Sequence, residues 1–195
     1  AYYLDTGWVS SDSTIELPNS SSIWIADKNT IGVNEPVKLT WTSDQNITFE
    51  KIITLDENYL FSVDQRVINN SGLSFDLYPY GLSKRQGIPE MQNFFILHEG
   101  PLSITDGVLE EYDYDDLKDD KKIKHSSVGG WIGMTDKYWQ TAIIPNQDEP
   151  VQQTYSYSFV DNIDNFQTDI VGERIAVSNN ASISHNFKIF AGPKI

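Results

Sequence analysis

The stretch that decides the fold is "GGWIGMTDKYWQTAIIP", residues 129–145. Its two arms, WIGM at 131–134 and YWQTAIIP at 138–145, are rich in the aromatic and branched side chains that strands favour. The polar residues 135–137 separate the arms, so the stretch predicts a β-hairpin. Glycines before and within the first arm allow a bulge or a close approach of neighbouring backbone.

Large side chains stand on both sides of the second arm of this hairpin. Such a strand is covered on both faces, so we expect it at the centre of a packed sheet. We also expect the indole rings of Trp131 and Trp139 to lie in the core, because aromatic side chains dominate core burial. Stacking of these rings on a ligand is the alternative.

Outside the hairpin, apolar residues mostly alternate with polar ones, which is the period of a strand with one buried face. In 36–42, for example, Val37, Leu39 and Trp41 share one side. Many such strands joined by short polar turns predict an all-β, antiparallel sandwich with at most short helices. We find no repeat and no linker, so we expect residues 1–195 to form a single domain. The further predicted strands cover 47–55, 58–72, 73–79, 92–100, 151–160 and 181–192.

The segment 108–124 interrupts this alternation. Leu109, Tyr112 and Leu117 form an imperfect helical stripe, with acidic residues early and lysines late, which suits a helix dipole. Because the stripe is weak, we favour a solvated acidic excursion that contains at most a short helix.

Composition excludes several classes of function. The chain carries 14 lysines and arginines against 28 aspartates and glutamates, a formal net charge of −14. Nucleic-acid binding needs a basic face, so DNA and RNA are excluded as partners. The chain has no cysteine, which excludes disulfides, thiolate metal sites and cysteine nucleophiles. Its apolar runs are far shorter than the ~20 residues of a spanning helix, so we expect no transmembrane segment.

Acid–base chemistry would rest on the three histidines. His98 and Glu99 are adjacent, and neighbours on a strand point to opposite faces, so they cannot form a catalytic pair with each other. We expect His125, beside the acidic excursion, to be exposed, and His185, on the apolar side of its strand, to be a core or cleft histidine. The chain contains none of the common catalytic or phosphate-binding motifs. We therefore expect no catalytic residue, no metal and no cofactor.

The hairpin and the segments around it resemble, in order, the periplasmic domain of the YidC family of bacterial membrane protein insertases. The resemblance covers essentially the whole chain. The matching segments outside the hairpin are TGWVS at 6–10, LPNSSSIW at 17–24, residues 36–72, LYPYGLSKRQGIPE at 77–90, residues 96–117 and FAGPKI at 190–195. The structural signature within the hairpin consists of Gly129, Gly130, Trp131, Gly133, Asp136, Tyr138, Trp139 and Pro145.

The resemblance implies a β-supersandwich of the galactose-mutarotase type, on the periplasmic side of the bacterial inner membrane. It implies a non-catalytic domain of a protein that inserts and folds inner-membrane proteins, with or without the Sec translocon. The implied partners are SecD/SecF and nascent inner-membrane proteins, and the implied role is scaffolding or docking. Membrane helices absent from this chain would tether the domain, and upstream strands of the family domain would be missing. The candidates for a cleft or partner contact are His98, Glu99, Trp131 and Trp139.

Two other functions stay open. The fold kinship also suits a carbohydrate-binding or aldose-epimerase-like domain, in which histidines and carboxylates such as His98, His185, Glu99 and Glu173 would have to converge on a sugar. A cleft lined by tryptophan or tyrosine could instead bind unfolded segments or lipid-like chains.

Overall fold

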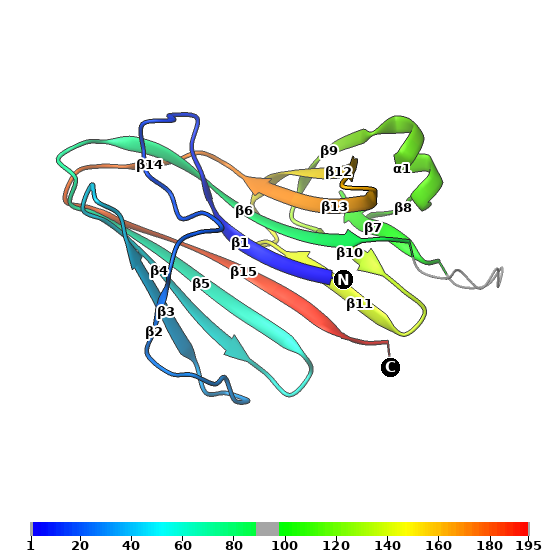
Figure 1. The fold of residues 1–195 in the computed structure, drawn as a ribbon, viewed down its shortest axis with the longest axis horizontal. Coiled ribbons are helices and arrows are strands. Elements are labelled where there is room, and N and C mark those ends of the chain that lie inside the picture. Colours follow the sequence, from blue (N-terminus) through cyan, green and yellow to red (C-terminus); the bar gives the residue numbers. More distant parts are fainter. Residues whose placement is uncertain (1, 89–97, 195) are drawn as a thin grey trace.

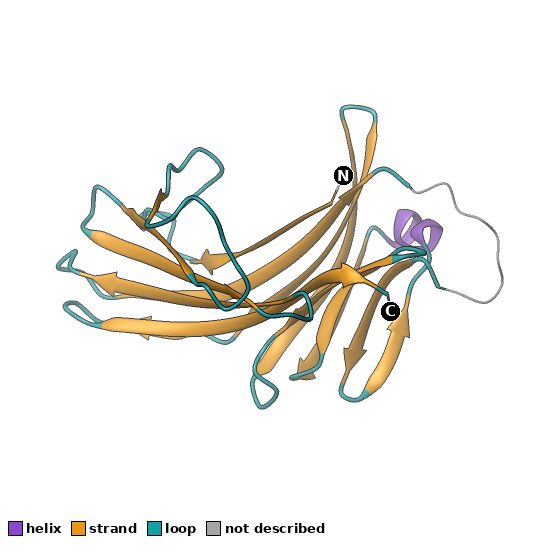
Figure 2. Ribbon diagram, turned by 90° about the horizontal axis from the view of Figure 1, so that it is seen from below, coloured by secondary structure: helices purple, strands orange, loops and turns teal. Residues whose placement is uncertain are grey.

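The computed structural model describes residues 2–88 and 98–194. In these residues the strands form two antiparallel sheets, accompanied by one short helix, α1 (Tyr114–Asp120) (Figure 1). Both sheets are curved, and α1 lies at one end of them (Figure 2). This arrangement confirms the predicted all-β antiparallel sandwich.

The smaller sheet has the strand order β1-β6-β13-β12-β9, and β14 pairs with the beginning of β6. All of these pairings are antiparallel. The strands are β1 (Tyr2–Val9), β6 (Phe75–Gln86), β9 (Lys122–Val128), β12 (Pro150–Val160), β13 (Ile163–Gly172) and β14 (Ile175–Val177).

The larger sheet has the order β2-β3-β4-β5-β15-β11-β10-β7-β8. β15, the last strand of the sequence, lies in the middle of this sheet. It pairs with β5 on one side and with β11 on the other, and so joins the strands of residues 25–69 to those of residues 100–144. The strands are β2 (Ile25–Ala26), β3 (Val37–Thr42), β4 (Ile47–Leu55), β5 (Leu60–Asn69), β7 (Gly100–Thr105), β8 (Val108–Glu111), β10 (Trp131–Thr135), β11 (Trp139–Ile144) and β15 (Ser182–Pro193).

Two apolar clusters make up the core of the sandwich. One lies near α1 and includes Tyr155, Phe166 and Phe187, which are fully buried. The other includes Trp8 and Phe49 and joins β1 to β4, β5, β6 and β14. Burial of each large apolar side chain stabilises the fold by roughly 1.5–3 kcal/mol, so the predicted alternation is what holds the sheets together.

The predicted hairpin is present. β10 and β11 pair antiparallel, with Gly133 opposite Ala142, and β11 lies inside the sheet between β10 and β15. The expectation that both indole rings are core is wrong, because Trp139 is 41% exposed and Trp131 is half-buried. Trp139 is the first residue of β11 and therefore stands at the rim of the sheet.

The other predicted strands match strands of the structure, except for 92–100. Residues 92–97 lie outside the described residues, and His98 and Glu99 precede β7 and are not part of a strand. Tyr59 and Leu73, within the predicted strands 58–72 and 73–79, lie just before β5 and β6 and are 46% and 54% exposed. The predicted strands that match are 36–42 with β3, 47–55 with β4, 58–72 with β5, 73–79 with the start of β6, 151–160 with β12 and 181–192 with β15.

The acidic segment 108–124 divides into β8, α1 and the start of β9. The seven-residue helix confirms that at most a short helix forms, and it buries Tyr114 and Leu117 in the core. Leu109 is not part of a helical stripe, because it lies on β8 and is 52% exposed.

Candidate functional site

An apolar groove of about 760 Å³ lies on the inner face of the larger sheet. Because side chains alternate along a strand, every second residue of β3, β4, β5 and β15 points toward the groove, and most of these residues are apolar. The segment Lys28–Ile31 and the start of β1 cover it from the other side. The apolar side chains that line it include Val37, Leu39, Ile53, Phe61, Val63 and Ile189.

A polar cluster closes one end of the groove. The Lys51 ammonium donates a hydrogen bond to the Thr6 carbonyl, lies 3.4 Å from an Asp5 carboxylate oxygen and stacks 5.2 Å from the Trp24 ring centre. The Tyr80 hydroxyl donates to the other Asp5 oxygen at 2.8 Å. Burial, followed by the Asp5 charge, raises the pKa of Tyr80 well above its usual value, so this hydroxyl stays a donor.

A smaller hollow of about 400 Å³ adjoins the groove and shares Asp5, Thr6 and Lys51 with it. Gln65 lines this hollow from β5 and is 1% exposed. Neither its amide nitrogen nor its amide oxygen has a hydrogen-bond partner among the described residues.

The sequence held a signal for this cluster that our prediction did not use. Lys51 occupies an inward position between Phe49 and Ile53, and Gln65 one between Val63 and Val67. A polar residue at an apolar position is uncommon unless it has a partner inside the fold. The hydrogen-bond partners of Lys51 come from β1, and nothing in the local pattern of β4 indicates that contact.

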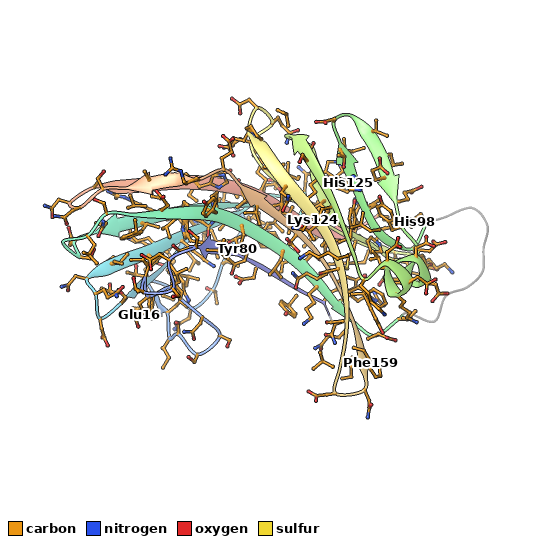
Figure 3. All side chains as sticks on the ribbon, turned by 90° about the horizontal axis from the view of Figure 1, so that it is seen from above. Glu16, Tyr80, His98, Lys124, His125 and Phe159 are labelled. Atoms are coloured by element: carbon orange, nitrogen blue, oxygen red, sulfur yellow. The ribbon has the colours of Figure 1, made fainter. Side chains whose placement is uncertain are left out.

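The three histidines do not converge. His98 Nε2 lies 3.1 Å from the Pro101 carbonyl oxygen, and His125 Nε2 lies 2.8 Å from the Tyr112 hydroxyl. Both lie in the half of the molecule that contains α1, away from Tyr80 (Figure 3). His125 is half-buried under Tyr112, so our expectation that it is exposed is wrong.

His185 is a buried histidine, as its position on the strand predicted. It is 8% exposed, and its ring contacts those of Trp8 and Phe187. Its Nε2 lies 2.9 Å from Glu149 Oε2, so β15 is tied to the loop before β12. Within the described residues, no group of three histidine, aspartate or glutamate side chains is close enough to hold a metal ion.

The four residues predicted for a cleft or partner contact do not form one site. His98 and Glu99 precede β7, which lies beside the β10 end of the hairpin. Trp131 begins β10 and Trp139 begins β11, so antiparallel pairing puts them at opposite ends of the two paired strands. None of the four lines the apolar groove.

Several residues of the hairpin signature have a geometric role. A side chain on Gly130, whose φ is +72°, would start 2.1 Å from the Ile104 carbonyl oxygen. Asp136 forms an ion pair with Arg85, which ties the hairpin turn to β6. Tyr138 and Trp139 have no such role, because their side chains are 70% and 41% exposed.

A sequence model of the family described as "YidC periplasmic domain" matches residues 1–195. The chain belongs to the YidC periplasmic domain family. It is 37% identical over 195 residues to the membrane protein insertase YidC of Rickettsia bellii, covering 100% of this chain and 35% of the relative. It is also 37% identical to the YidC of Pelagibacter ubique, covering 99% of this chain and 34% of that relative. The chain thus spans about a third of the length of the curated relatives it matches.

A solved structure confirms the fold type expected for a YidC periplasmic domain. A galactose mutarotase-like protein from Lactobacillus casei superposes with a TM-score of 0.58 at 11% identity, over 86% of this chain and 72% of the other. At this identity the likeness concerns the fold alone. YidC periplasmic domains are not an enzyme family, which contradicts the epimerase alternative.

Membership of the YidC family also confirms the predicted place of the domain, on the periplasmic side of the inner membrane. No helix among residues 2–88 and 98–194 has the length and apolar character needed to cross a membrane.

Proposed function

We propose that this domain is the non-catalytic docking part of a membrane protein insertase, and that its apolar groove receives an extended apolar segment of a client membrane protein. The observation that carries the proposal is the groove itself. Its volume of about 760 Å³ falls within the usual range of binding pockets, roughly 300–1,000 Å³.

The chemistry of the groove favours binding over reaction. The charged side chains at its closed end, Lys51 and Asp5, neutralise each other, and Tyr80 holds the same carboxylate. An apolar segment that enters the groove therefore meets mainly apolar walls, and at the closed end it meets polar groups that already have partners. Burial of about 100 Å² of apolar surface there contributes roughly 2.5 kcal/mol, which suits weak and reversible binding.

The SecD/SecF partners would dock elsewhere. The β12–β13 hairpin projects from the body with Phe159 at its tip (Figure 3). Phe159, Val160 and Ile163 are 59%, 53% and 44% exposed, and such apolar side chains favour contact with another protein. We propose this tip as the contact with a protein partner of the SecD/SecF type.

Adjacent residues of β4 give a matched test of the groove. Ile53 points into the groove, whereas Ile52 points outward and is 39% exposed. A photo-crosslinking amino acid would be placed at either position in the full-length insertase while a client membrane protein is being inserted. We expect client adducts from position 53 and few from position 52. Equal yields from both positions, or no adduct from position 53, would overturn the proposal.

A further inference from the structure

One edge of the larger sheet exposes aromatic and aliphatic side chains. At this edge β3, β5 and β11 begin and β4, β15 and β10 end. Val33, Tyr59, Tyr138 and Trp139, which we call the aromatic edge, are 48%, 46%, 70% and 41% exposed.

These side chains belong to neighbouring strand ends and so form one strip. Val33 bridges to Leu55 at the end of β4, and the Tyr59 carbonyl accepts a hydrogen bond from the Ala191 amide at 3.2 Å. On the other side of β15, the Tyr138 carbonyl accepts from the Lys194 amide at 3.0 Å, and Trp139 pairs with Pro193. Strands lie about 4.8 Å apart, so the strip from β4 to β11 is roughly 15 Å long.

The backbone at Tyr59 adopts a conformation that is unusual for an aromatic residue. Its φ is +62°, a conformation that bulky residues rarely adopt and that turns normally assign to glycine or asparagine. The strained position nevertheless carries an aromatic ring that is 46% exposed. A costly conformation at an exposed aromatic residue points to a role outside the fold.

The charge around the strip differs from that of the whole chain. Three lysines and four carboxylates lie in the segments that carry it, and one of the four, Asp136, is paired with Arg85, so the strip is close to neutral while the chain carries −14. The Lys137 ammonium lies 5.0 Å from the centre of the Tyr138 ring. Anionic lipids would therefore not repel this edge as they would the rest of the surface. The lysines are Lys28, Lys137 and Lys194, and the carboxylates are Glu35, Asp56, Glu57 and Asp136.

We propose that the aromatic edge lies in the headgroup region of the lipid bilayer and orients the domain on the membrane. Tyrosine and tryptophan prefer this region because their rings are apolar and their tips are polar. Lysines beside them can extend their ammonium groups toward the headgroups. Pro193 and Lys194 lie beside Trp139 and Tyr138, so the end of β15 is part of the same strip. The inference rests on membership of an insertase family and not on the role proposed for the groove.

The test uses the full-length insertase in vesicles that are mostly phosphatidylethanolamine with a minor share of phosphatidylglycerol. The domain contributes no cysteine, so a single environment-sensitive fluorophore can be attached at Tyr138→Cys in a protein whose other cysteines are replaced. The matched control is Leu73→Cys, an exposed apolar position, 54% accessible, in the turn at the opposite edge. The quencher is a spin label on the lipid headgroup.

We expect lipid-borne quenching to be several-fold stronger at position 138 than at position 73. It should change little between low and high salt, because the edge is near neutral and salt screens only charge interactions. Replacing Tyr59 and Trp139 by serine should reduce quenching at position 138 at least twofold. Equal quenching at both positions would overturn the proposal. So would protection of position 138 from an aqueous quencher without lipid quenching, which would identify a protein partner instead.

Discussion

A methyl group on Gly133 would lie 1.8 Å from the carbonyl oxygen of Thr141 on the neighbouring strand. β10 and β11 therefore approach so closely at this point that no side chain fits. This contact explains why the hairpin signature contains a glycine within its first arm, and it gives the first prediction.

Gly133→Ala should destabilise the domain by about 1–3 kcal/mol, because the methyl group must push two central strands apart. Urea unfolding followed by tryptophan fluorescence would measure the change. Gly32→Ala is the control, since its methyl group would meet only the Glu35 side chain, at 3.1 Å from the carboxylate. A Gly133→Ala variant as stable as Gly32→Ala would show that the strands can separate without cost.

The sequence predicted the strands well because alternation is a local property. It predicted the hairpin, the sandwich and the buried position of His185, all of which follow from which residues share a face. It failed for Trp139 because alternation gives the side of a strand and not its exposure at the strand's end. The sequence did not predict the contact between Asp5 and Tyr80, because these residues are 75 positions apart and meet only through the pairing of β1 with β6.

Breaking the ion pair between Arg85 and Asp136 should cost about 2–4 kcal/mol, because it leaves a partly buried charge without its partner. The two side chains are only 11% and 21% exposed. A double-mutant cycle with Asp136→Ala and Arg85→Met should give a coupling energy above about 1 kcal/mol.

The control for this cycle is the pair of Arg174 and Asp76. These side chains are 62% and 37% exposed, so their coupling should stay below about 1 kcal/mol. Additive effects of Asp136→Ala and Arg85→Met would mean that the pair does not hold the hairpin turn to β6.

The domain should lose stability as pH rises above about 10. Burial raises the pKa of Tyr114 to about 12 and raises that of Tyr155 well above its usual value of 10.0. Between the usual tyrosine pKa and the raised pKa of the folded state, the unfolded chain releases a proton that the folded chain keeps. The free energy of unfolding therefore falls by about 1.4 kcal/mol per pH unit for each such tyrosine. Below pH 10 this contribution is fully present.

Tyr114→Phe should make the alkaline fall in stability less steep by about one proton, measured by urea unfolding across that pH range. The variant keeps the ring that packs 4.6 Å from the centre of Phe166. A Tyr114→Phe slope equal to that of the unmodified chain would contradict the argument.

Gln65→Leu should raise the free energy of unfolding by about 1 kcal/mol, because a buried amide without a hydrogen-bond partner costs roughly 1–3 kcal/mol. Leucine keeps most of the side-chain volume at a position that is 1% exposed and removes both polar atoms.

Gln153→Leu is the contrasting variant. Gln153 is also buried, but its amide accepts a hydrogen bond from the Thr105 hydroxyl at 2.6 Å and donates one to the Ile104 carbonyl at 3.1 Å. That change should destabilise the domain by about 1–3 kcal/mol, since it leaves the Thr105 hydroxyl and the Ile104 carbonyl without a hydrogen-bond partner. If Gln65→Leu were as destabilising as Gln153→Leu, the Gln65 amide would have to be satisfied in solution, and the polar hollow beside the groove would be a hydrated part of the fold.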